Sequence, residues 1–253
     1  MAGILKNRRR SKFSVRTAET VEDMRAAQQL RHAVFRSSDD ATETSHHDRD
    51  AYDMRCTHVL IESVGTGELV ATFRMMPLES GAEINSTYSA QFYSLEALKG
   101  YDRPIVEIGR FCIRSDQTDP DILRAAWAAI AAHVDKTGTE LLIGCSSFKG
   151  IDESMYADAF AMLRERHLAP RRWWPRIKAP NVFKFAERLK LSPDRTKALR
   201  TMPPLLRSYL SMGGWVSDHA VIDRDLNTLH VFTGLEVRKI PPARRKALLS
   251  LAN

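Results

Sequence analysis

The chain has 253 residues and a formal net charge of +7, with 43% hydrophobic and 27% charged residues. This composition is typical of a soluble globular protein, and no apolar run is long enough for a transmembrane helix or a secretory signal. Three widely spaced cysteines exclude a disulfide framework or a cysteine metal cluster and are typical of a reduced cytoplasmic protein. The positive charge favours an acidic partner or an anionic surface.

The sequence is predicted to contain a short basic arm and one large domain. Residues 1–12 carry several arginines and lysines and are expected to be flexible. Residues 13–253 contain no repeat or low-complexity tract, and we expect a single domain there with an appended segment at about 150–215.

The first part of this domain combines strands with one amphipathic helix. Thr20 and Asp23 form a capping-box pattern that opens a helix running to about Phe35. The polar, acidic segment 37–53 is longer than an ordinary connection and is expected to be functional or disordered. Strands are predicted over residues 13–16, 58–63 and 69–76, the last two as a hairpin.

Residues 106–113 are apolar enough for a buried strand, yet they contain Glu107 and Arg110. Burying a charge is costly unless it is paired or used. Residues three apart on a regular strand point to opposite faces, but a bulge supplied by Gly109 would bring both to one face. We therefore expect a bulged central strand with Glu107 and Arg110 directed into one cleft; an inter-strand ion pair is the alternative.

A helix and a second buried strand follow this strand. Asp119 and Pro120 predict the start of a helix that runs to about Lys136. Residues 140–148 are then expected to form a strand parallel to 106–113. Beyond it, helices are predicted over 156–166, 181–190 and from 203, strands over 220–222 and 229–232, and a helical tail after 242.

A series of motifs occurs in a characteristic order along the chain. They are Arg31, Phe35, Asp48–Asp53, Cys56, His58, Leu60, Arg74, Phe92–Ser94, Glu107, Arg110, Trp127, Gly144–Phe148 and Pro203–Leu210. Their order and spacing resemble the bacterial L-ornithine N-acyltransferases of the GNAT superfamily, over nearly the whole chain from about residue 13. The resemblance implies an α/β fold with a mixed sheet, GNAT-like, carrying a C-terminal extension of helices and strands.

The same resemblance implies an acyltransferase. It implies transfer of a 3-hydroxyacyl chain from the phosphopantetheine of acyl carrier protein to the α-amine of ornithine, giving lyso-ornithine lipid, with no bound cofactor. After Phe35 the chain reads Arg-Ser-Ser-Asp-Asp, where the family usually has paired glutamates, so glutamine remains an alternative acceptor. Several of these positions also match the acyl-homoserine lactone synthases, which provide a second alternative.

Candidate roles follow from the resemblance and from the chemistry of the residues. A desolvated Glu107 can accept the proton of the acceptor amine. Arg110 and Arg74 can hold its carboxylate or order the acidic loop. The catalytic candidates are thus Glu107 and Arg110, and the substrate-binding candidates are Arg31, Phe35, Asp50, Asp53 and Arg74. The acyl-pantetheine-binding candidates are Phe111, Cys112, Ile113, Ser146 and Phe148.

The segment after residue 113 bears on the acyl donor. Enzymes that use acetyl-CoA usually have a glycine-rich loop there, which binds pyrophosphate at a helix N-terminus. Residues 114–119 contain no glycine and two aspartates. This favours a carrier-protein donor, and the basic surface suits an acidic carrier protein.

A second basic segment combines cations with indoles. Arg171, Arg172, Trp173 and Trp174 are typical of a contact with anionic lipid headgroups. We expect a peripheral enzyme at the inner face of the cytoplasmic membrane, although both indoles packing in the core is the alternative. A basic membrane-binding module without enzymatic activity is the non-enzyme alternative. Neither nucleic-acid binding nor a metal site is expected, because the His46-His47-Asp48 motif has no matching ligands elsewhere.

Overall fold

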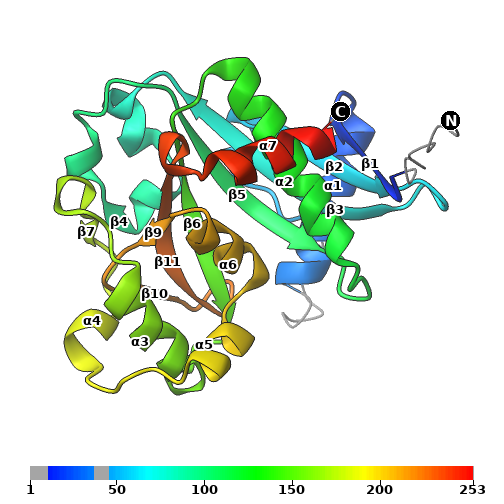
Figure 1. Ribbon diagram of the computed structural model, residues 1–253. Coiled ribbons are helices and arrows are strands. Elements are labelled where there is room, and N and C mark those ends of the chain that lie inside the picture. The colour runs from blue at the N-terminus through cyan, green and yellow to red at the C-terminus, as the bar shows by residue number, and fades with distance from the viewer. Residues whose placement is uncertain (1–10, 37–45, 253) are drawn as a thin grey trace, which may run out of the picture.

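The computed structural model describes residues 11–36 and 46–252, and a nine-stranded mixed sheet forms its centre (Figure 1). Most of the predicted basic arm and residues 37–45 of the acidic loop lie outside the described residues. The strand order is β1-β2-β3-β5-β6-β11-β10-β8, with β9 also paired to β11. The strands are β1 (Phe13–Thr17), β2 (Thr57–Ser63), β3 (Leu69–Leu78), β5 (Ile105–Ile113), β6 (Leu141–Lys149), β8 (Val182–Phe183), β9 (Trp215–Val216), β10 (Ala220–Asp223) and β11 (Thr228–Glu236).

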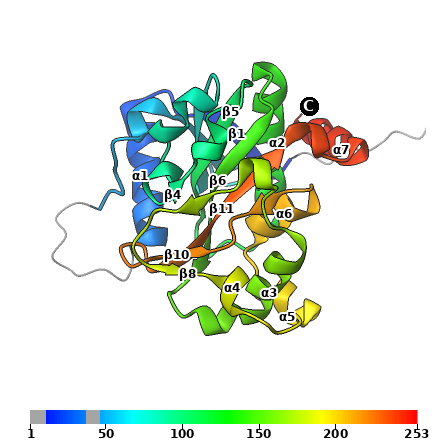
Figure 2. The ribbon, with the colours of Figure 1, turned by 90° about the vertical axis from the view of Figure 1, so that its left-hand side faces the viewer.

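Helices cover both faces of this sheet. Figure 2 shows α1 on one side of the strands and α2, α6 and α7 on the other, and we call these sides the α1 face and the α2 face. The small sheet of β4 (Tyr93–Ser94) and β7 (Arg176–Ile177) lies on the α1 face. The helices are α1 (Val21–Phe35), α2 (Pro120–Thr137), α3 (Ala157–Arg166), α4 (Phe185–Arg188), α5 (Arg195–Thr201), α6 (Pro204–Ser211) and α7 (Pro242–Ala252).

Capping residues set the ends of the two long helices, as the sequence predicts. Thr20 accepts the backbone N–H of Asp23 at 3.1 Å, and the Asp23 carboxylate accepts the N–H of Thr20 at 3.2 Å, which completes the capping box of α1. Asp119 caps α2, and Gly138 ends it with a left-handed φ of 66°.

Three apolar clusters hold the layers together. On the α2 face, Trp127 and Ile130 of α2 pack against β-strand residues that include Ile108. A second cluster on the same face surrounds Phe148 and Phe160. A third cluster, on the α1 face, packs the segment around β4 against Phe232 and its neighbours. Because apolar side chains are buried on both faces of the sheet, the central strands are almost continuous runs of hydrophobic residues.

The parallel pair β5–β6 separates half-way along its length. Its register runs from Ile105 opposite Leu141 to Ile108 opposite Gly144, and pairing stops there. At this point the strands approach closely, because a Cβ on Gly144 would lie 2.3 Å from the Ile108 carbonyl oxygen. Beyond it, β5 continues along β3 and β6 continues along β11, which leaves a gap between the facing edges of β5 and β6.

The predicted bulge in the central strand is present. Pairing between β3 and β5 shifts by one residue, since Thr72 lies opposite Cys112 whereas Arg74 lies opposite Gly109. Arg110 rather than Gly109 takes the unusual conformation, with φ of 51°. A non-glycine residue with this backbone marks a position that surrounding contacts hold in place.

The segment between β6 and β10 differs in detail from the prediction. Residues 181–190 do not form one helix; they form the short strand β8 and the single turn α4. The unpredicted helix α5 is capped by Asp194, whose carboxylate accepts the N–H groups of Thr196 and Lys197. Within the described part of the chain, no helix is long and apolar enough to cross a membrane.

Candidate active site

A cavity of about 330 Å³ occupies the gap between β5 and β6. Its lining comes from both faces of the sheet, so the cavity passes through it. On the α1 face the cavity is lined mainly by polar side chains and by the ring of Phe35 from α1. The other residues on this face include Tyr88, Glu107, Arg110, Cys145, Ser147, Asp223 and His230. Mainly apolar side chains line it on the α2 face, including Phe111, Ile113, Leu123, Leu205, Leu206 and Tyr209.

Glu107 places a buried carboxylate in this cavity. The residue is 4% exposed, and its carboxylate accepts three hydrogen bonds. The backbone N–H of Tyr88 donates to Oε2 at 2.8 Å, and the N–H and Oγ of Ser89 donate to Oε1 at 2.8 and 2.6 Å. Burial raises the pKa of Glu107 above its usual range, and these donors oppose the rise without cancelling it. A carboxylate with a raised pKa is suited to proton transfer near neutral pH.

Arg110 lines the same cavity but does not pair with Glu107. Its Nε lies 2.9 Å from the Asp48 carboxylate and its terminal nitrogen 3.3 Å from Asp50. Its guanidinium carbon sits 4.9 Å from the centre of the Tyr88 ring, a cation–π contact. The bulge therefore brings Glu107 and Arg110 to one cavity. Within the described residues Glu107 forms no ion pair, whereas Arg110 is paired with Asp48 and Asp50.

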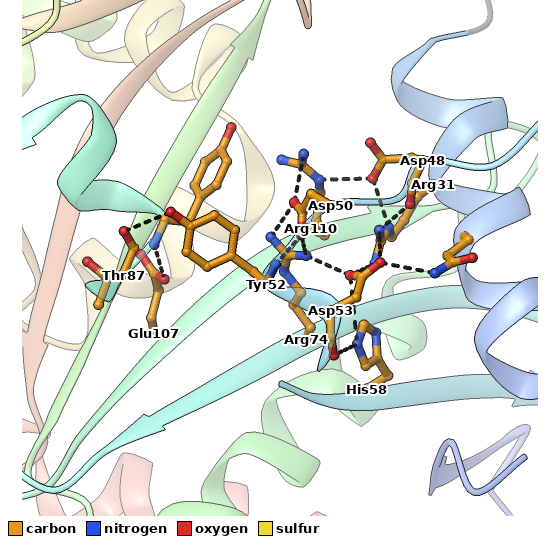
Figure 3. A network of polar contacts seen from close by, with 12 residues as sticks. Arg31, Asp48, Asp50, Tyr52, Asp53, His58, Arg74, Thr87, Glu107 and Arg110 are labelled. Carbon is orange, nitrogen blue, oxygen red and sulfur yellow. Dashed lines mark hydrogen bonds and ion pairs between the residues drawn. The ribbon is translucent and has the colours of Figure 1, made fainter. Parts of the chain in front are cut away.

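Three arginines and three aspartates form a buried network beside the cavity (Figure 3). Arg31 of α1 binds Asp48 and Asp53, each at 2.8 Å. Arg74 of β3 binds Asp50 at 2.6 Å and Asp53 at 2.7 Å. Each aspartate contacts at least one guanidinium, and the three positive charges of the network equal its three negative charges.

The environment of Asp53 explains why the network stays charged. Burial alone would raise its pKa, but Arg31 and Arg74 outweigh burial and lower the pKa to about 2. Gln28 adds a hydrogen bond at 3.0 Å, and Nε2 of His58 contacts the Asp53 carbonyl at 3.0 Å. The Asp48–Asp53 segment is thereby held against α1 and β3.

The predicted substrate-binding residues fall into two groups. Phe35 lines the cavity, whereas Arg31, Asp50, Asp53 and Arg74 are not among its lining residues and form the network behind it. Of the two uses considered for Arg74, the observed contacts are those that order the acidic loop.

The predicted acyl-binding residues are also divided. Phe111, Cys112, Ile113 and Ser146 line the cavity, and Ser146 accepts a hydrogen bond from Thr233 at 2.9 Å. Phe148 does not line the cavity. It is 1% exposed and packs against Tyr156 and Phe160 in the second cluster of the α2 face.

Sequence reasoning missed several residues that the fold brings to the site. Tyr88 and Ser89 come from an irregular segment, and Asp223 and His230 come from β10 and β11, all distant in sequence from residues 106–113. Asp223 follows a predicted strand, which was the one available signal. The described residues contain no group of three or more His, Cys, Asp and Glu arranged to hold a metal ion.

The basic-aromatic segment 171–174 lies on the α1 face, and none of its residues lines the cavity. Trp173 packs edge-to-face on Tyr101 and under the guanidinium of Arg172, which also pairs with Glu236 at 2.8 Å. Trp173 and Trp174 are half-buried against the third cluster, whereas Arg171 and Arg172 are exposed. The indoles thus contribute to packing while the cations face outward.

Comparisons with known proteins place this site in context. Residues 30–128 match the family described as acetyltransferase (GNAT) domain. The chain is 30% identical, over 92% of its length, to an L-ornithine N(alpha)-acyltransferase of Rhodobacter capsulatus, of which it covers 93%. A protein of the same name from Brucella abortus is 28% identical over 90% of this chain and 85% of its own.

One solved structure supports the fold assignment. FeeM, an N-acyl amino acid synthase from uncultured soil microbes, superposes with a TM-score of 0.51 at 11% identity. The match covers 90% of this chain and 93% of FeeM. At this identity the similarity concerns the fold alone, which is the GNAT fold.

Proposed function

The chain belongs to the L-ornithine N(alpha)-acyltransferase family and is an acyltransferase, and from this premise we propose that it transfers a 3-hydroxyacyl chain from acyl carrier protein to the α-amine of ornithine. The product is lyso-ornithine lipid. The observation that carries the proposal is the cavity through the sheet, with a buried carboxylate on one face and apolar walls on the other.

Glu107 acts as the general base on the α1 face. An α-ammonium group must lose a proton before it can attack a thioester, and Glu107 accepts this proton directly or through water. The neutral amine then attacks the carbonyl carbon, and the amide bond forms as the carbon–sulfur bond breaks. The second proton lost by the amine passes to the departing sulfur, which leaves as the thiol. Ser89 and Tyr88 hold the carboxylate in place through three hydrogen bonds.

The bulge and the gap provide groups for the developing oxyanion. Arg110 and Phe111 fall within the register shift of β5, outside its regular ladder with β3. Backbone N–H groups along this edge can donate to the thioester oxygen as negative charge develops on it. The phosphopantetheine arm lies in the gap between β5 and β6, where the two strands are no longer paired.

The acyl chain occupies the α2-face part of the cavity. Phe111, Leu123, Leu205 and Tyr209 provide apolar walls there, as a hydrocarbon chain requires. Ser146 and Thr233 lie on the same face and are the polar pair available to a 3-hydroxyl group. The acceptor stays on the α1 face, so the two substrates meet at the gap.

The start of α2 supports a carrier-protein donor over coenzyme A. The carboxylate of Asp119 accepts the N–H of Asp121 at 2.9 Å and so occupies an amide where a pyrophosphate would bind. Arg114 is paired with Asp116 at 2.7 Å in the same loop. A phosphopantetheine arm anchored on a carrier protein does not need this cradle.

Arg110 is the cation that receives the acceptor carboxylate. It is the one lysine or arginine among the described residues that line the cavity. Its partners Asp48 and Asp50 fix the guanidinium, while the bulge keeps it beside Glu107. An amino acid with its carboxylate at Arg110 and its α-amine at Glu107 would be oriented for attack on the thioester.

A direct assay tests the proposal. The purified protein is incubated with 3-hydroxyacyl carrier protein, or with the matching acyl-CoA, and a panel of amino acids that includes ornithine and glutamine. Mass spectrometry should detect N-acyl-ornithine, formed faster from the carrier protein. Preferential formation of N-acyl-glutamine, or absence of any acylated product, would refute it.

A further inference from the structure

One carboxylate of the cavity is not explained by catalysis. Among the described residues that line the cavity, the acidic ones are Glu107 and Asp223. Glu107 is held by three donors and performs the proton transfer proposed above. Asp48, Asp50 and Asp53 are matched by arginines, which leaves Asp223 as a separate negative charge in the cavity.

Asp223 is buried without a cation. Its residue is 8% exposed, and within the described part of the chain it forms no ion pair with a lysine or arginine. Its hydrogen-bond donor there is the N–H of Leu226, 3.1 Å from Oδ1, in the turn between β10 and β11. A carboxylate buried to this extent is costly unless a cation or several donors compensate it.

His230 supplies a second unsatisfied group on the same wall. The register pairs Val221 with His230 and Asp223 with Thr228, so Asp223 and His230 lie on one face of β10 and β11. The Tyr93 hydroxyl donates to the His230 carbonyl at 2.7 Å and lies 3.1 Å from Nδ1. Nδ1–H therefore donates to this hydroxyl, which leaves Nε2 as an acceptor.

This acceptor is also without a partner. The His230 residue is 2% exposed, and its Nε2 atom makes no hydrogen bond within the described residues. Burial, helped by His219, lowers the pKa of His230 to about 3, so the imidazole is neutral. A carboxylate and a neutral nitrogen acceptor together are the complement of an alkylammonium group.

From this arrangement, and resting on the proposed function, we infer that Asp223 and His230 form the subsite that receives a protonated amino group on the acceptor's side chain. The carboxylate matches the positive charge, and Nε2 accepts one of its N–H groups. The subsite thus selects a diamino acid such as ornithine over a neutral amino acid such as glutamine, and it assigns the selection to Asp223 rather than to Asp50 or Asp53.

The position of Asp223 agrees with this role. The Ser89 hydroxyl lies 2.6 Å from the Glu107 carboxylate and 3.4 Å from the Cys145 sulfur. Burial raises the pKa of the Cys145 thiol, and Glu107 and Asp223 both add to the rise, so both carboxylates lie near this residue. The two amino groups of extended ornithine are about 6 Å apart, and a hydrogen bond of about 3 Å at each end gives the acceptor a reach of about 12 Å.

The test is Asp223→Asn in the full chain, assayed with ornithine and with norvaline, which has the same carbon chain without the amine. Asparagine keeps an oxygen for the Leu226 N–H, so the turn and the melting temperature should be retained. We expect kcat/KM for ornithine to fall about 10- to 100-fold and that for norvaline to change less than about threefold. Asp225→Asn, exposed in the same turn, is the matched control and should leave both values unchanged.

The outcomes separate this inference from the proposed function. Equal losses on ornithine and norvaline, or an undiminished rate with ornithine, would overturn the assignment of Asp223 while leaving the N-acyltransferase activity intact. A wild-type preference for norvaline or glutamine over ornithine would refute the proposed function, and the inference with it. Failure of the wild-type protein to acylate any amino acid would likewise refute the proposed function on which the inference rests.

Discussion

Ser89 donates two hydrogen bonds to one carboxylate oxygen of Glu107, from its backbone N–H at 2.8 Å and from its hydroxyl at 2.6 Å. These residues lie 18 positions apart in the chain, on an irregular turn and on the central strand. The contact fixes the carboxylate at the opening between β5 and β6, and it makes Glu107 the first target for mutation.

Glu107→Gln should lower kcat about a hundredfold or more, because glutamine cannot accept the proton of the acceptor amine. Its amide nitrogen would also face a backbone donor, which should reduce the free energy of unfolding by about 1–3 kcal/mol. Steady-state kinetics and thermal denaturation measure the two effects. Glu187→Gln, at an exposed position of α4, is the control. Wild-type turnover in folded Glu107→Gln would contradict the role of the base.

The pH dependence should report the same group. Burial raises the pKa of Glu107 above its value in the unfolded chain, so its deprotonated, active form increases as pH rises through the raised pKa. We expect kcat/KM to rise through this pKa in the wild type, and this limb to be absent in Glu107→Gln. The stabilisation associated with protonated Glu107 is complete below the unfolded pKa and is lost over the same rise. A limb that persists in Glu107→Gln belongs to another group.

The buried arginine–aspartate network should be essential for stability. Arg31→Met leaves Asp48 and Asp53 with less compensation in the interior, which should cost about 3–5 kcal/mol of unfolding free energy. Arg16→Met removes an exposed arginine that also pairs with two carboxylates, and it should cost at most about 1 kcal/mol. Denaturant titration compares the two variants, and equal losses would show that burial of the network is not what matters.

The network should also make the free energy of unfolding fall at acid pH. The pKa of Asp53 is lowered to about 2 in the folded protein, below the value of about 3.9 in an unfolded chain. Its stabilisation is therefore present above the unfolded value and is lost as pH falls toward 2. Denaturation measured between pH 6 and 2 should show this loss, and the loss should be smaller in Asp53→Asn.

The acyl chain should respond to the size of the α2-face walls. Leu205 lines the cavity, so Leu205→Trp should fill part of it and shift preference toward shorter acyl chains. Leu199→Trp is a matched control, because Leu199 lies on the neighbouring helix α5 and is 37% exposed. Competition between carrier proteins with long and short chains measures the shift. An unchanged chain-length preference in Leu205→Trp would place the acyl chain elsewhere.

Membrane contact is a prediction for the exposed cations of segment 171–174. Each cation near an anionic bilayer contributes about 1 kcal/mol, so Arg171→Glu should weaken co-sedimentation with anionic vesicles at low salt. Arg195→Glu, exposed on α5, is the control. Trp174→Ala should weaken it further if the indole leaves the third cluster to reach the interface. If the wild-type protein does not co-sediment with anionic vesicles, this segment is excluded as a membrane anchor.

The sequence by itself determined the local elements and the family. The capping residues of α1 and α2 and the bulge near Glu107 follow from short-range patterns, because caps and bulges depend on neighbouring residues. The parallel pairing of β5 and β6 follows from the order strand, helix, strand along the chain. The motif spacing identified the acyltransferase family before the cavity was known. The prediction was less accurate for short elements such as α4 and α5, because a single capping residue or proline decides where such an element begins and ends.

Only the tertiary structure decided how the charges are used. In the sequence, Asp50 and Asp53 are candidates for substrate binding, but folding places Arg74 and Arg31 against them. Asp223 follows a predicted strand and has no predicted role in the sequence, yet folding buries it in the cavity, where no lysine or arginine of the described residues pairs with it. The partners of a charged side chain come from strands and helices far away in sequence, and burial then determines its free energy. Neither the partners nor the burial of a side chain can be read from the local sequence pattern. The sequence therefore predicted the elements of this site, and the fold determined which of its charges are paired.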